Sequence, residues 1–207
     1  GASLLLNLCE FVKSLHEIPL PNCCAKKCDE AAGTNLHELT REFIAFNASA
    51  LSSQQMLILQ NEHERVAEAL AIADRFSRSI VHGDLHGENI LVNGSGALIG
   101  VIDFDDAWID SKVWEFAGIA RGHCFNDEGC LLPNEFYNLY VEAKSLLNSH
   151  FTLEEFTKLV RTACFRNMLR IFQSDYIEVD QKIRAQRRMN QWLDLRRWMG
   201  TWDTLQA

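Results

Sequence analysis

Two short segments in the middle of the chain constrain its fold more than any other part of the sequence. Residues 81–92 read VHGDLHGENILV, and residues 100–105 read GVIDFD. In each segment, polar residues border a run of apolar, β-prone residues. The tetrapeptide NGSG at 93–96 lies between the two segments and is a strong turn signal. We therefore expect strands at 89–92 and 98–102 that pair as a β-hairpin.

Three polar residues of this region match the needs of phosphoryl transfer. Asp84 and Asn89 lie five positions apart in the loop that leads into the hairpin, and Asp103 follows the second strand. Phosphoryl transfer requires an acidic group that orients the attacking hydroxyl, and oxygen ligands that hold Mg²⁺ on the nucleotide phosphates. Because the turn brings Asn89 and Asp103 to the same end of the hairpin, we expect these two residues to bind Mg²⁺. Asp84 is then the expected catalytic carboxylate.

The two motifs together resemble the signature of a known group of enzymes. The pattern HGDLHxxN at 82–89, followed by IDF at 102–104, is similar to that of the aminoglycoside phosphotransferase and choline kinase families. These families are small-molecule kinases with a protein-kinase-like fold. The resemblance implies an α+β, mostly helical fold in which a small β-hairpin carries the catalytic and metal residues. Either motif alone would be weak, and the alternative is a coincidental hairpin with surface carboxylates.

The resemblance also implies a function, which is ATP- and Mg²⁺-dependent transfer of the γ-phosphoryl group to a hydroxyl of a small molecule. Asp84 is the expected catalytic residue, and His86 is a second catalytic candidate because it lies between Asp84 and Asn89. His82 is expected to pack against the loop. Glu115 matches an acidic residue that anchors the loop backbone in these families, although their usual residue is Asp. The acceptor is open, and an amino sugar, choline, homoserine or another metabolite would fit.

The start of the chain resembles the opening of a kinase C-terminal lobe. The segment SLHEIP at 14–19 is similar to the Leu-His-x-x-Pro stretch that follows the hinge in these families. The sequence contains no Gly-x-Gly-x-x-Gly loop and no Val-Ala-x-Lys strand. The resemblance therefore implies that residues 1–207 form the C-terminal lobe alone, without an N-terminal ATP-clamping lobe. Truncation, loss of that half and a separate chain that supplies it are all open.

Two other functions fit a lone lobe. One is a kinase-like binding module without catalysis, against which the complete set of Asp84, Asn89 and Asp103 argues. The other is a subunit completed by a partner chain or by self-association. Such a subunit would leave an exposed apolar face along the first helix and the hairpin, where the absent lobe would dock.

Composition and charge limit the classes of partner. The chain is 47% hydrophobic and 23% charged, which suits one globular domain, and its net charge of −8 argues against a general nucleic-acid binder. The negative charge and the acidic residues Asp175, Glu178 and Asp180 would suit a cationic acceptor, although a solvated loop explains the acidic residues as well. No apolar run reaches the roughly 20 residues of a membrane span, and no signal peptide is recognisable, so we expect a cytoplasmic protein.

Several charged and thiol side chains have no assigned role. Seven cysteines, an odd number, fit reduced thiols better than a disulfide framework. Cys23, Cys24 and Cys28 form a cluster whose spacing is not a recognised zinc pattern, so we expect incidental thiols. Asp105 and Asp106 would support a metal or a cationic substrate, or would be solvated loop charges. Five arginines near the C-terminus are expected on the surface, with phosphate binding as the alternative: Arg184, Arg187, Arg188, Arg196 and Arg197.

Apolar residues at helical spacing predict that most of the chain is helical. The expected helices are 3–17, 36–51, 52–76, 113–122, 132–147 and 152–172, with a last helix that begins at Asp180. A strand at 79–82 precedes the hairpin. Thr152 and Glu155 form a capping-box pattern at the start of the helix 152–172. The inward residues expected in the helix 52–76 are Leu57, Leu59, Val66, Leu70 and Ala73.

Overall fold

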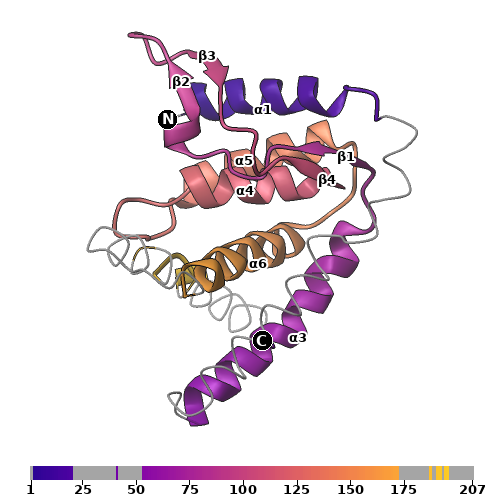
Figure 1. Cartoon of the computed structure of the whole chain (residues 1–207), viewed down its shortest axis with the longest axis vertical. Coiled ribbons are helices and arrows are strands. Elements are labelled where there is room, and N and C mark those ends of the chain that lie inside the picture. The colour runs from indigo at the N-terminus through magenta and orange to yellow at the C-terminus, as the bar shows by residue number, and fades with distance from the viewer. Residues whose placement is uncertain are drawn as a thin grey trace.

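The computed structural model describes residues 2–20, 41, 53–172, 187, 190–192 and 194–195, and helices dominate this part of the chain (Figure 1). The helices are α1 (Ala2–His16), α3 (Ser53–Ala73), α4 (Val113–His123), α5 (Pro133–Leu146) and α6 (Leu153–Phe172), and a short 3₁₀ helix spans Gly87–Asn89. The strands are β1 (Arg78–Val81), β2 (Ile90–Val92), β3 (Leu98–Val101) and β4 (Trp108–Ser111).

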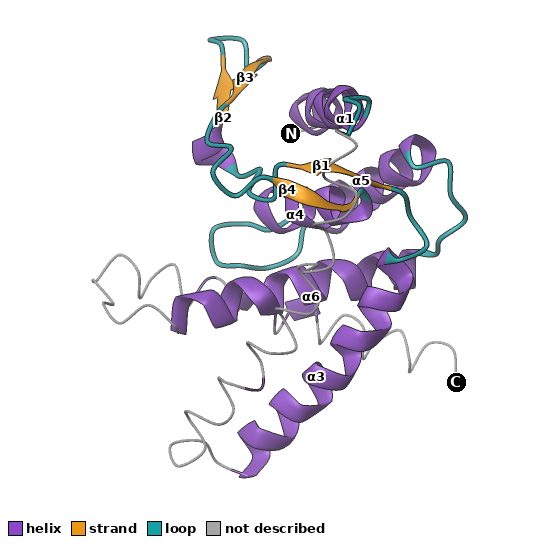
Figure 2. Ribbon diagram, turned by 45° about the vertical axis from the view of Figure 1, so that its right-hand side comes forward, coloured by secondary structure: helices purple, strands orange, loops and turns teal. Residues whose placement is uncertain are grey.

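Helix α4 lies at the centre of the fold because apolar residues cover most of its surface. Val113, Phe116, Ala117, Ile119 and Ala120 are all fully buried. A helix that is apolar on nearly every side must be covered on nearly every side. Figure 2 shows how this is done: α4 lies among the helices, packed on α5 and α6, while α1 covers α5 and the strand β1.

Helix α6 begins at the capping box that the sequence predicts. The backbone N–H of Glu155 donates to Thr152 Oγ1 over 3.1 Å, and the backbone N–H of Thr152 donates to Glu155 Oε2 over 2.8 Å. These two bonds satisfy backbone donors that the first turn leaves unpaired. The helix then buries Phe156, Leu159 and Val160 in the core, as their spacing predicts.

The strands form two separate antiparallel pairs. The predicted hairpin is β2–β3, with Ile90 opposite Val101, and the Asn93 side chain accepts bonds from Ser95 N and Ala97 N to close its turn. The other pair, β1–β4, places Val81 opposite Trp108. Strand β4 was not predicted from the sequence, because its partner β1 is distant in the chain and no local turn signal joins the two. It matters for the site, since it fixes the end of β1 from which the loop at 82–89 starts.

Helix α3 differs from the prediction at its N-terminal end. Val66 and Ala73 are buried and Leu70 packs against the core, as predicted, but Leu57 has 57% of its surface exposed. The packed part of α3 lies against α6, where Arg75 pairs with Glu155 at 2.9 Å, and Leu57 lies well before that contact in the chain. The side chain of Leu59, the helix 36–51 apart from Arg41, the Cys23–Cys28 cluster and the start of the last helix at Asp180 lie outside the part of the chain that the structure describes.

Four of the seven cysteines lie in the described residues and are free thiols. Cys9, Cys124 and Cys164 are buried, and burial raises the pKa of both Cys9 and Cys164 to about 12. A thiol with so high a pKa is a poor nucleophile, so these residues act as small apolar core side chains. Among the helices that the structure describes, none is long and apolar enough to cross a membrane.

Candidate active site

A buried carboxylate on α4 binds the backbone at the start of the loop at 82–89. Glu115 is fully buried, and its two oxygens accept the backbone N–H groups of His82 and Gly83, the latter over 3.3 Å. This contact confirms the anchoring role expected for Glu115 in spite of its extra methylene relative to Asp. Burial raises the pKa of Glu115 to about 7, and the two backbone N–H groups oppose that rise.

The loop can pass so close to β4 only because residue 83 is a glycine. Gly83 has φ +79°, and a Cβ at this position would lie 2.1 Å from Cζ3 of Trp108. The indole is itself fixed, since its Nε1 donates to Asp110 Oδ2 over 2.9 Å and the Arg166 guanidinium lies 4.8 Å from the ring centroid. Trp108 is therefore a rigid surface on which the loop rests.

His82 links the loop to the second motif. The ring is fully buried, and Nδ1 accepts the backbone N–H of Asp84 over 3.4 Å. Nε2 lies 3.0 Å from the carbonyl oxygen of Ile102, and the ring contacts Phe104 at a centroid distance of 4.5 Å. Because Nδ1 is an acceptor here, Nε2 carries the proton and donates it to Ile102. These contacts agree with the packing role expected of His82.

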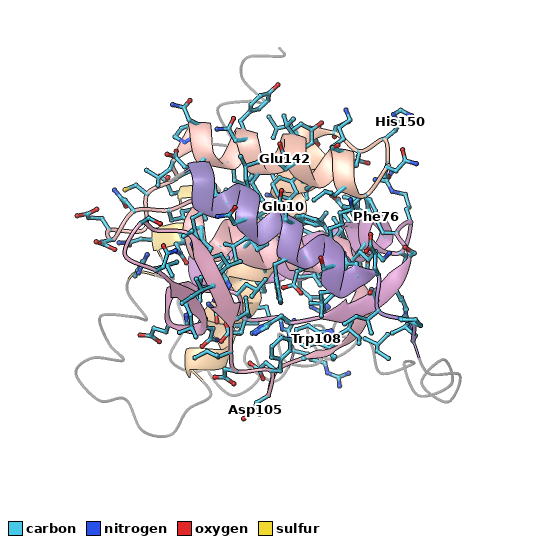
Figure 3. All side chains as sticks on the ribbon, turned by 90° about the horizontal axis from the view of Figure 1, so that it is seen from above. Glu10, Phe76, Asp105, Trp108, Glu142 and His150 are labelled. Atoms are coloured by element: carbon cyan, nitrogen blue, oxygen red, sulfur yellow. The ribbon has the colours of Figure 1, made fainter. Side chains whose placement is uncertain are left out.

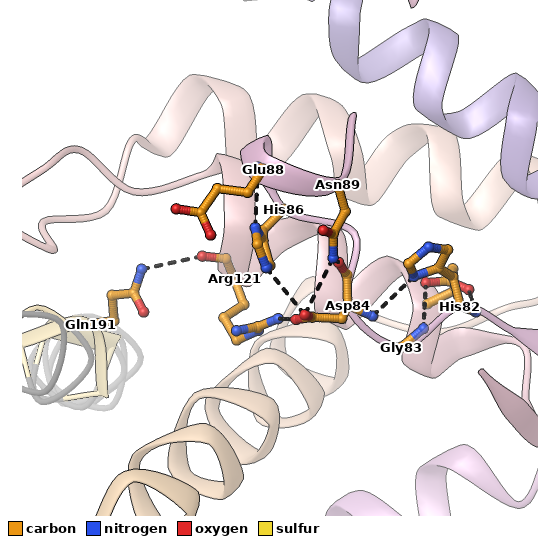
Figure 4. A network of polar contacts seen from close by, with 9 residues as sticks. His82, Gly83, Asp84, His86, Glu88, Asn89, Arg121 and Gln191 are labelled. Atoms are coloured by element: carbon orange, nitrogen blue, oxygen red, sulfur yellow. Dashed lines mark hydrogen bonds and ion pairs between the residues drawn. The ribbon is translucent and has the colours of Figure 1, made fainter. Parts of the chain in front are cut away.

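The Asp84 carboxylate is contacted by three side chains (Figure 4). Oδ1 accepts from Arg121 Nη2 over 2.9 Å, and Oδ2 lies 3.1 Å from His86 Nε2. Asn89 Nδ2 donates to the Asp84 carbonyl oxygen over 3.0 Å and lies 3.4 Å from Oδ2. Partial burial favours a higher pKa for Asp84, but the bond from His86 and the charge of Arg121 outweigh it. The pKa of Asp84 is therefore held well below its usual range.

Arg121 was not predicted from the sequence. It lies on α4, 37 residues beyond Asp84, and its side chain is 11% exposed. An arginine near the C-terminal end of a helix resembles a surface residue in sequence, and only the packing of α4 beneath the loop brings Arg121 to Asp84. His86 also has a local role, because its Nδ1 accepts the backbone N–H of Glu88 and so caps the short 3₁₀ helix.

The two expected metal residues lie at the same end of the hairpin. The backbone N–H of Ile102 donates to the carbonyl oxygen of Asn89 over 3.0 Å, which places Asp103 next to Asn89. Asp103 is exposed and has φ +63°, a conformation that Asp tolerates better than most residues. Asp105 and Asp106 are exposed as well, and Figure 3 shows Asp105 at the outer edge of the molecule.

An amide oxygen and a carboxylate are the kinds of ligand that Mg²⁺ accepts, and the rest of its shell is commonly water and phosphate. Asn89 directs its nitrogen at Asp84, which leaves the amide oxygen as the atom for a metal. Within the described residues, no group of three or more His, Cys, Asp or Glu side chains is placed to hold a metal. The side-chain oxygens of Asn89 and Asp103 are of the kind that can serve as ligands to Mg²⁺.

A cavity of about 320 Å³ opens beside His86 and Arg121, which both line it. The described C-terminal residues form its far wall, where Gln191 Nε2 donates to the Arg121 carbonyl oxygen over 3.1 Å. Two glycines and seven residues with polar or charged side chains line it: His86, Gly87, Glu88, Arg121, Gly122, His123, Asn167, Arg187 and Gln191. A cavity of this size has room for a small molecule.

The anchored loop, the hairpin that follows it and the helices beneath them define a kinase-like lobe. The chain belongs to the phosphotransferase enzyme family, whose family model matches residues 2–144. This match confirms the family that the two sequence motifs indicate. One curated relative, the homoserine kinase of Zymomonas mobilis, is 31% identical in an alignment of 119 residues that covers 51% of this chain and 35% of that enzyme.

Solved structures confirm the fold class. An ethanolamine kinase of Plasmodium vivax has a TM-score of 0.61 at 14% identity, over 94% of this chain and 59% of that one. The GDP complex of aminoglycoside 2'-phosphotransferase-IIIa also has a TM-score of 0.61, at 16% identity, over 92% of this chain and 62% of that one. The ternary complex of APH(2")-IIa with streptomycin and ATP has a TM-score of 0.57 at 16% identity, over 89% and 60%. This chain thus spans about three-fifths of the length of these structures.

Proposed function

We propose that the protein, together with whatever completes it, transfers the γ-phosphoryl group of ATP to a hydroxyl of a small molecule. The observation that carries this proposal is the Asp84 carboxylate, which Arg121, His86 and Asn89 hold beside the end of the hairpin where Asp103 lies. Family membership supports the reaction class. The relatives whose names state an acceptor act on homoserine, ethanolamine or aminoglycosides, all of which carry hydroxyl groups.

Asp84 would orient the hydroxyl of the acceptor. Its pKa is held low, so it is a carboxylate at neutral pH and is a weak base. The transition state of phosphoryl transfer is loose, and positioning of the nucleophile contributes more than proton removal. Arg121 and His86 restrict the carboxylate, and His86 is the second residue that we place in the reaction because its Nε2 reaches Oδ2.

Asn89 and Asp103 would hold Mg²⁺ through their side-chain oxygens. The bound ion supplies positive charge to the nucleotide phosphates. Asn89 also holds the Asp84 backbone through Nδ2, so one side chain would couple the position of the metal to that of the catalytic loop. The left-handed backbone of Asp103 supports a role of this kind, because uncommon backbone conformations concentrate at functional positions.

The test is an assay of phosphoryl transfer from ATP to a panel of hydroxyl compounds that includes homoserine, ethanolamine and an aminoglycoside. We expect Mg²⁺-dependent transfer to at least one of them. Asp84→Asn should lower kcat by about 100-fold or more, while the variant remains folded. An Asp84→Asn protein that keeps most of its kcat would contradict the role of Asp84.

A second candidate function is a subunit whose kinase site is completed by another polypeptide. Apolar side chains that are nearly half exposed or more lie on α1, the hairpin and the segment after it: Leu6, Leu91, Val92, Ile99, Ile102 and Phe104. If the chain alone binds ATP with Mg²⁺ but transfers nothing to any acceptor, this candidate or a non-catalytic binding module is favoured. If adding a partner polypeptide restores phosphoryl transfer, the chain is a partner-completed subunit and not a non-catalytic binding module.

A further inference from the structure

The turn of the β2–β3 hairpin contains a pair of residues that is suited to deamidation. Asn93 is followed by Gly94, and no other asparagine in the sequence precedes a glycine. In deamidation, the backbone nitrogen of the next residue attacks the amide carbon of the asparagine side chain. Glycine favours the attack because it has no side chain beside the nitrogen and few backbone restrictions. Both residues are exposed, so water and hydroxide reach them.

The side-chain oxygen of Asn93 is bound by three donors of the turn. Oδ1 accepts the backbone N–H groups of Ser95 and Ala97, each over 3.0 Å, and the Ser95 hydroxyl over 2.7 Å. Attack on Cγ converts the amide carbonyl into a tetrahedral centre and places negative charge on Oδ1. Donors that already point at this oxygen bind the charged form more strongly than the neutral carbonyl, as in an oxyanion hole. The turn therefore lowers the barrier to attack.

The attacking nitrogen and the leaving group are not engaged elsewhere in the part of the chain that the structure describes. There, neither the Gly94 N–H nor Asn93 Nδ2 donates a hydrogen bond. The ring that the Ser95 N–H closes on Oδ1 includes both the Gly94 nitrogen and the Asn93 Cγ, which limits how far apart these two atoms lie. The turn thus holds the two reacting atoms in one small ring and leaves the side-chain nitrogen free to depart.

Asn89, at the other end of the same hairpin, has none of these features. It is only 6% exposed, and its Nδ2 donates to the Asp84 carbonyl oxygen over 3.0 Å. The residue after it is Ile90, whose β-branched side chain crowds the backbone nitrogen. Asn89 should therefore keep its amide under conditions in which Asn93 loses it, and it serves as an internal comparison.

We propose that Asn93 is a site of spontaneous modification, at which a succinimide forms with Gly94 and opens to isoaspartate or aspartate. Hydroxide takes the proton of the Gly94 N–H, and the nitrogen forms a bond to the Asn93 Cγ. The bond from Cγ to Nδ2 then breaks, and Nδ2 takes a proton from water and leaves as ammonia. Water next adds to one imide carbonyl and cleaves its bond to the Gly94 nitrogen. Cleavage at Cγ gives aspartate, whereas cleavage at the main-chain carbonyl gives isoaspartate, in which the chain continues through Cγ.

Isoaspartate would loosen the hairpin because it changes the backbone of the turn. The main chain becomes one atom longer, and the carbonyl oxygen of residue 93, which accepts the Gly96 N–H over 2.9 Å, becomes part of a free carboxylate. Among the described strands, β2 and β3 pair only with each other. An isolated pair of strands is only marginally stable and depends on its turn for register. The modification therefore acts on the element that places Asp103 next to Asn89.

The test is incubation of the purified 207-residue chain at neutral and mildly alkaline pH, followed by tryptic digestion and mass spectrometry. Residues 79–112 form one tryptic peptide that contains both Asn89 and Asn93, and fragment masses show which of them has exchanged NH for O. A sample digested at time zero corrects for reaction during digestion, and enzymatic methylation detects isoaspartate. We expect the change at residue 93 alone, increasing with time and faster at the higher pH. An unchanged residue 93, or equal change at residue 89, would overturn the proposal.

Two substitutions in the turn test the roles of its parts. Gly94→Ala should slow the reaction severalfold, and apart from its chain neighbours the new Cβ meets nothing within 4 Å, so the turn keeps its shape. Ser95→Ala should also slow it, because it removes the hydroxyl donor from Oδ1. Gly87→Ala is the matched control, since its Cβ is equally free of contacts and lies outside the turn, and it should react like the unsubstituted chain. Gly94→Ala at the unsubstituted rate, or Ser95→Ala at an equal or faster rate, would contradict the mechanism.

Amide hydrogen exchange tests the effect on the hairpin. In chain that carries isoaspartate, the amides of residues 90–101 should exchange severalfold faster than in fresh chain, while those of α4 stay unchanged. Equal exchange in the hairpin of fresh and modified chain would show that the site does not control this element. Because neither mass nor exchange depends on turnover, these outcomes are independent of the transfer assay.

Discussion

Gly83 shows how a single residue positions the loop that carries Asp84. Its backbone has φ +79° and is packed against the Trp108 ring, so a side chain is excluded both by conformation and by space. The sequence motif contains the glycine, but the motif alone does not explain it. The explanation requires β4, which brings Trp108 to the loop.

We predict that Gly83→Ala lowers the free energy of unfolding by about 1–3 kcal/mol and displaces the loop. The new Cβ has no room beside the fixed indole, so loop or ring must shift. Urea denaturation of the whole chain measures the effect. Gly87→Ala is the control, because a Cβ there meets nothing within 4 Å, and its effect should stay within about 0.5 kcal/mol. Equal effects of the two substitutions would contradict this account of Gly83.

Glu115 makes the stability of the fold depend on pH. Its pKa in the folded chain is about 7, above the ordinary 4.5, because burial disfavours the charged carboxylate. The folded state therefore binds this proton more tightly than the unfolded state does. The stability that the protonated form contributes is complete below pH 4.5 and is lost as pH rises through 7. The total is about 3 kcal/mol.

We predict that Glu115→Gln reduces the dependence of the unfolding free energy on pH between 4.5 and 7. Glutamine resembles the protonated acid: it is neutral and keeps one oxygen for the backbone N–H groups of His82 and Gly83. Urea denaturation at several pH values checks this. Glu10→Gln, at an exposed position on α1, should retain the original slope. An unchanged slope in Glu115→Gln would show that another group titrates.

At the scale of elements, local sequence signals were sufficient to predict each helix or turn that is determined by residues adjacent in the chain. The turn at 93–96, the capping box at Thr152 and the apolar spacing of α1, α4 and α6 each predict an observed element within a few residues. The loop from His82 to Asn89 is also a local motif. The spacing of Asp84 and Asn89 within it is enough to identify both residues as candidates for the site.

The features that the sequence did not reveal depend on contacts between distant segments. Strand β4 pairs with β1 across a long stretch of chain, and Arg121 reaches Asp84 only because α4 passes beneath the loop. The exposure of Leu57 depends on where α3 leaves α6. The spacing of apolar residues along a helix shows which side of the helix is buried, but not which other element covers that side. These features could therefore be seen only in the three-dimensional structure.

Three elements are joined by a buried ion pair far from the loop. Arg161 on α6 donates to Glu62 on α3 through Nε over 2.9 Å and also through Nη2, and Trp192 Nε1 donates to the same carboxylate over 3.0 Å. All three side chains are at most 4% exposed. The pair fixes the angle between α3 and α6 and attaches the described C-terminal residues, including the wall of the cavity, to the helical core.

We predict that Glu62→Ala lowers the free energy of unfolding by about 3–5 kcal/mol, because it leaves the Arg161 charge buried without its carboxylate. Lys158→Ala is the control. Lys158 pairs with Glu68 and Glu154 on the surface of the same two helices, and its loss should cost less than about 1 kcal/mol. Urea denaturation compares the two variants. Similar losses would mean that the Glu62 contact is no stronger than a surface pair.

At the scale of the whole molecule, several large apolar side chains are exposed on the hairpin and on α1. Figure 1 shows the β2–β3 hairpin standing beside α1. Ile99 on this hairpin is 66% exposed, and Leu6, Leu91 and Val92 are 44–47% exposed. Exposed apolar side chains that gather in one region mark an interaction site or an aggregation site. This apolar face, formed by the hairpin and α1, is also where the sequence predicted that a second lobe or a partner would dock.

We predict that the chain self-associates in a concentration-dependent manner through this face. Each molecule that associates removes the side chains of the hairpin and α1 from water, and burial of apolar area contributes about 25 cal/mol per Å². Sedimentation velocity over a range of concentrations would detect the association. Ile99→Lys should shift the distribution toward the monomer, because it places a charge among the side chains that association would bury. Leu57→Lys is the control, since Leu57 is similarly exposed but lies on α3, away from the hairpin (Figure 1). A chain that is monomeric at every concentration, or an equal response to both substitutions, would show that this face does not drive association.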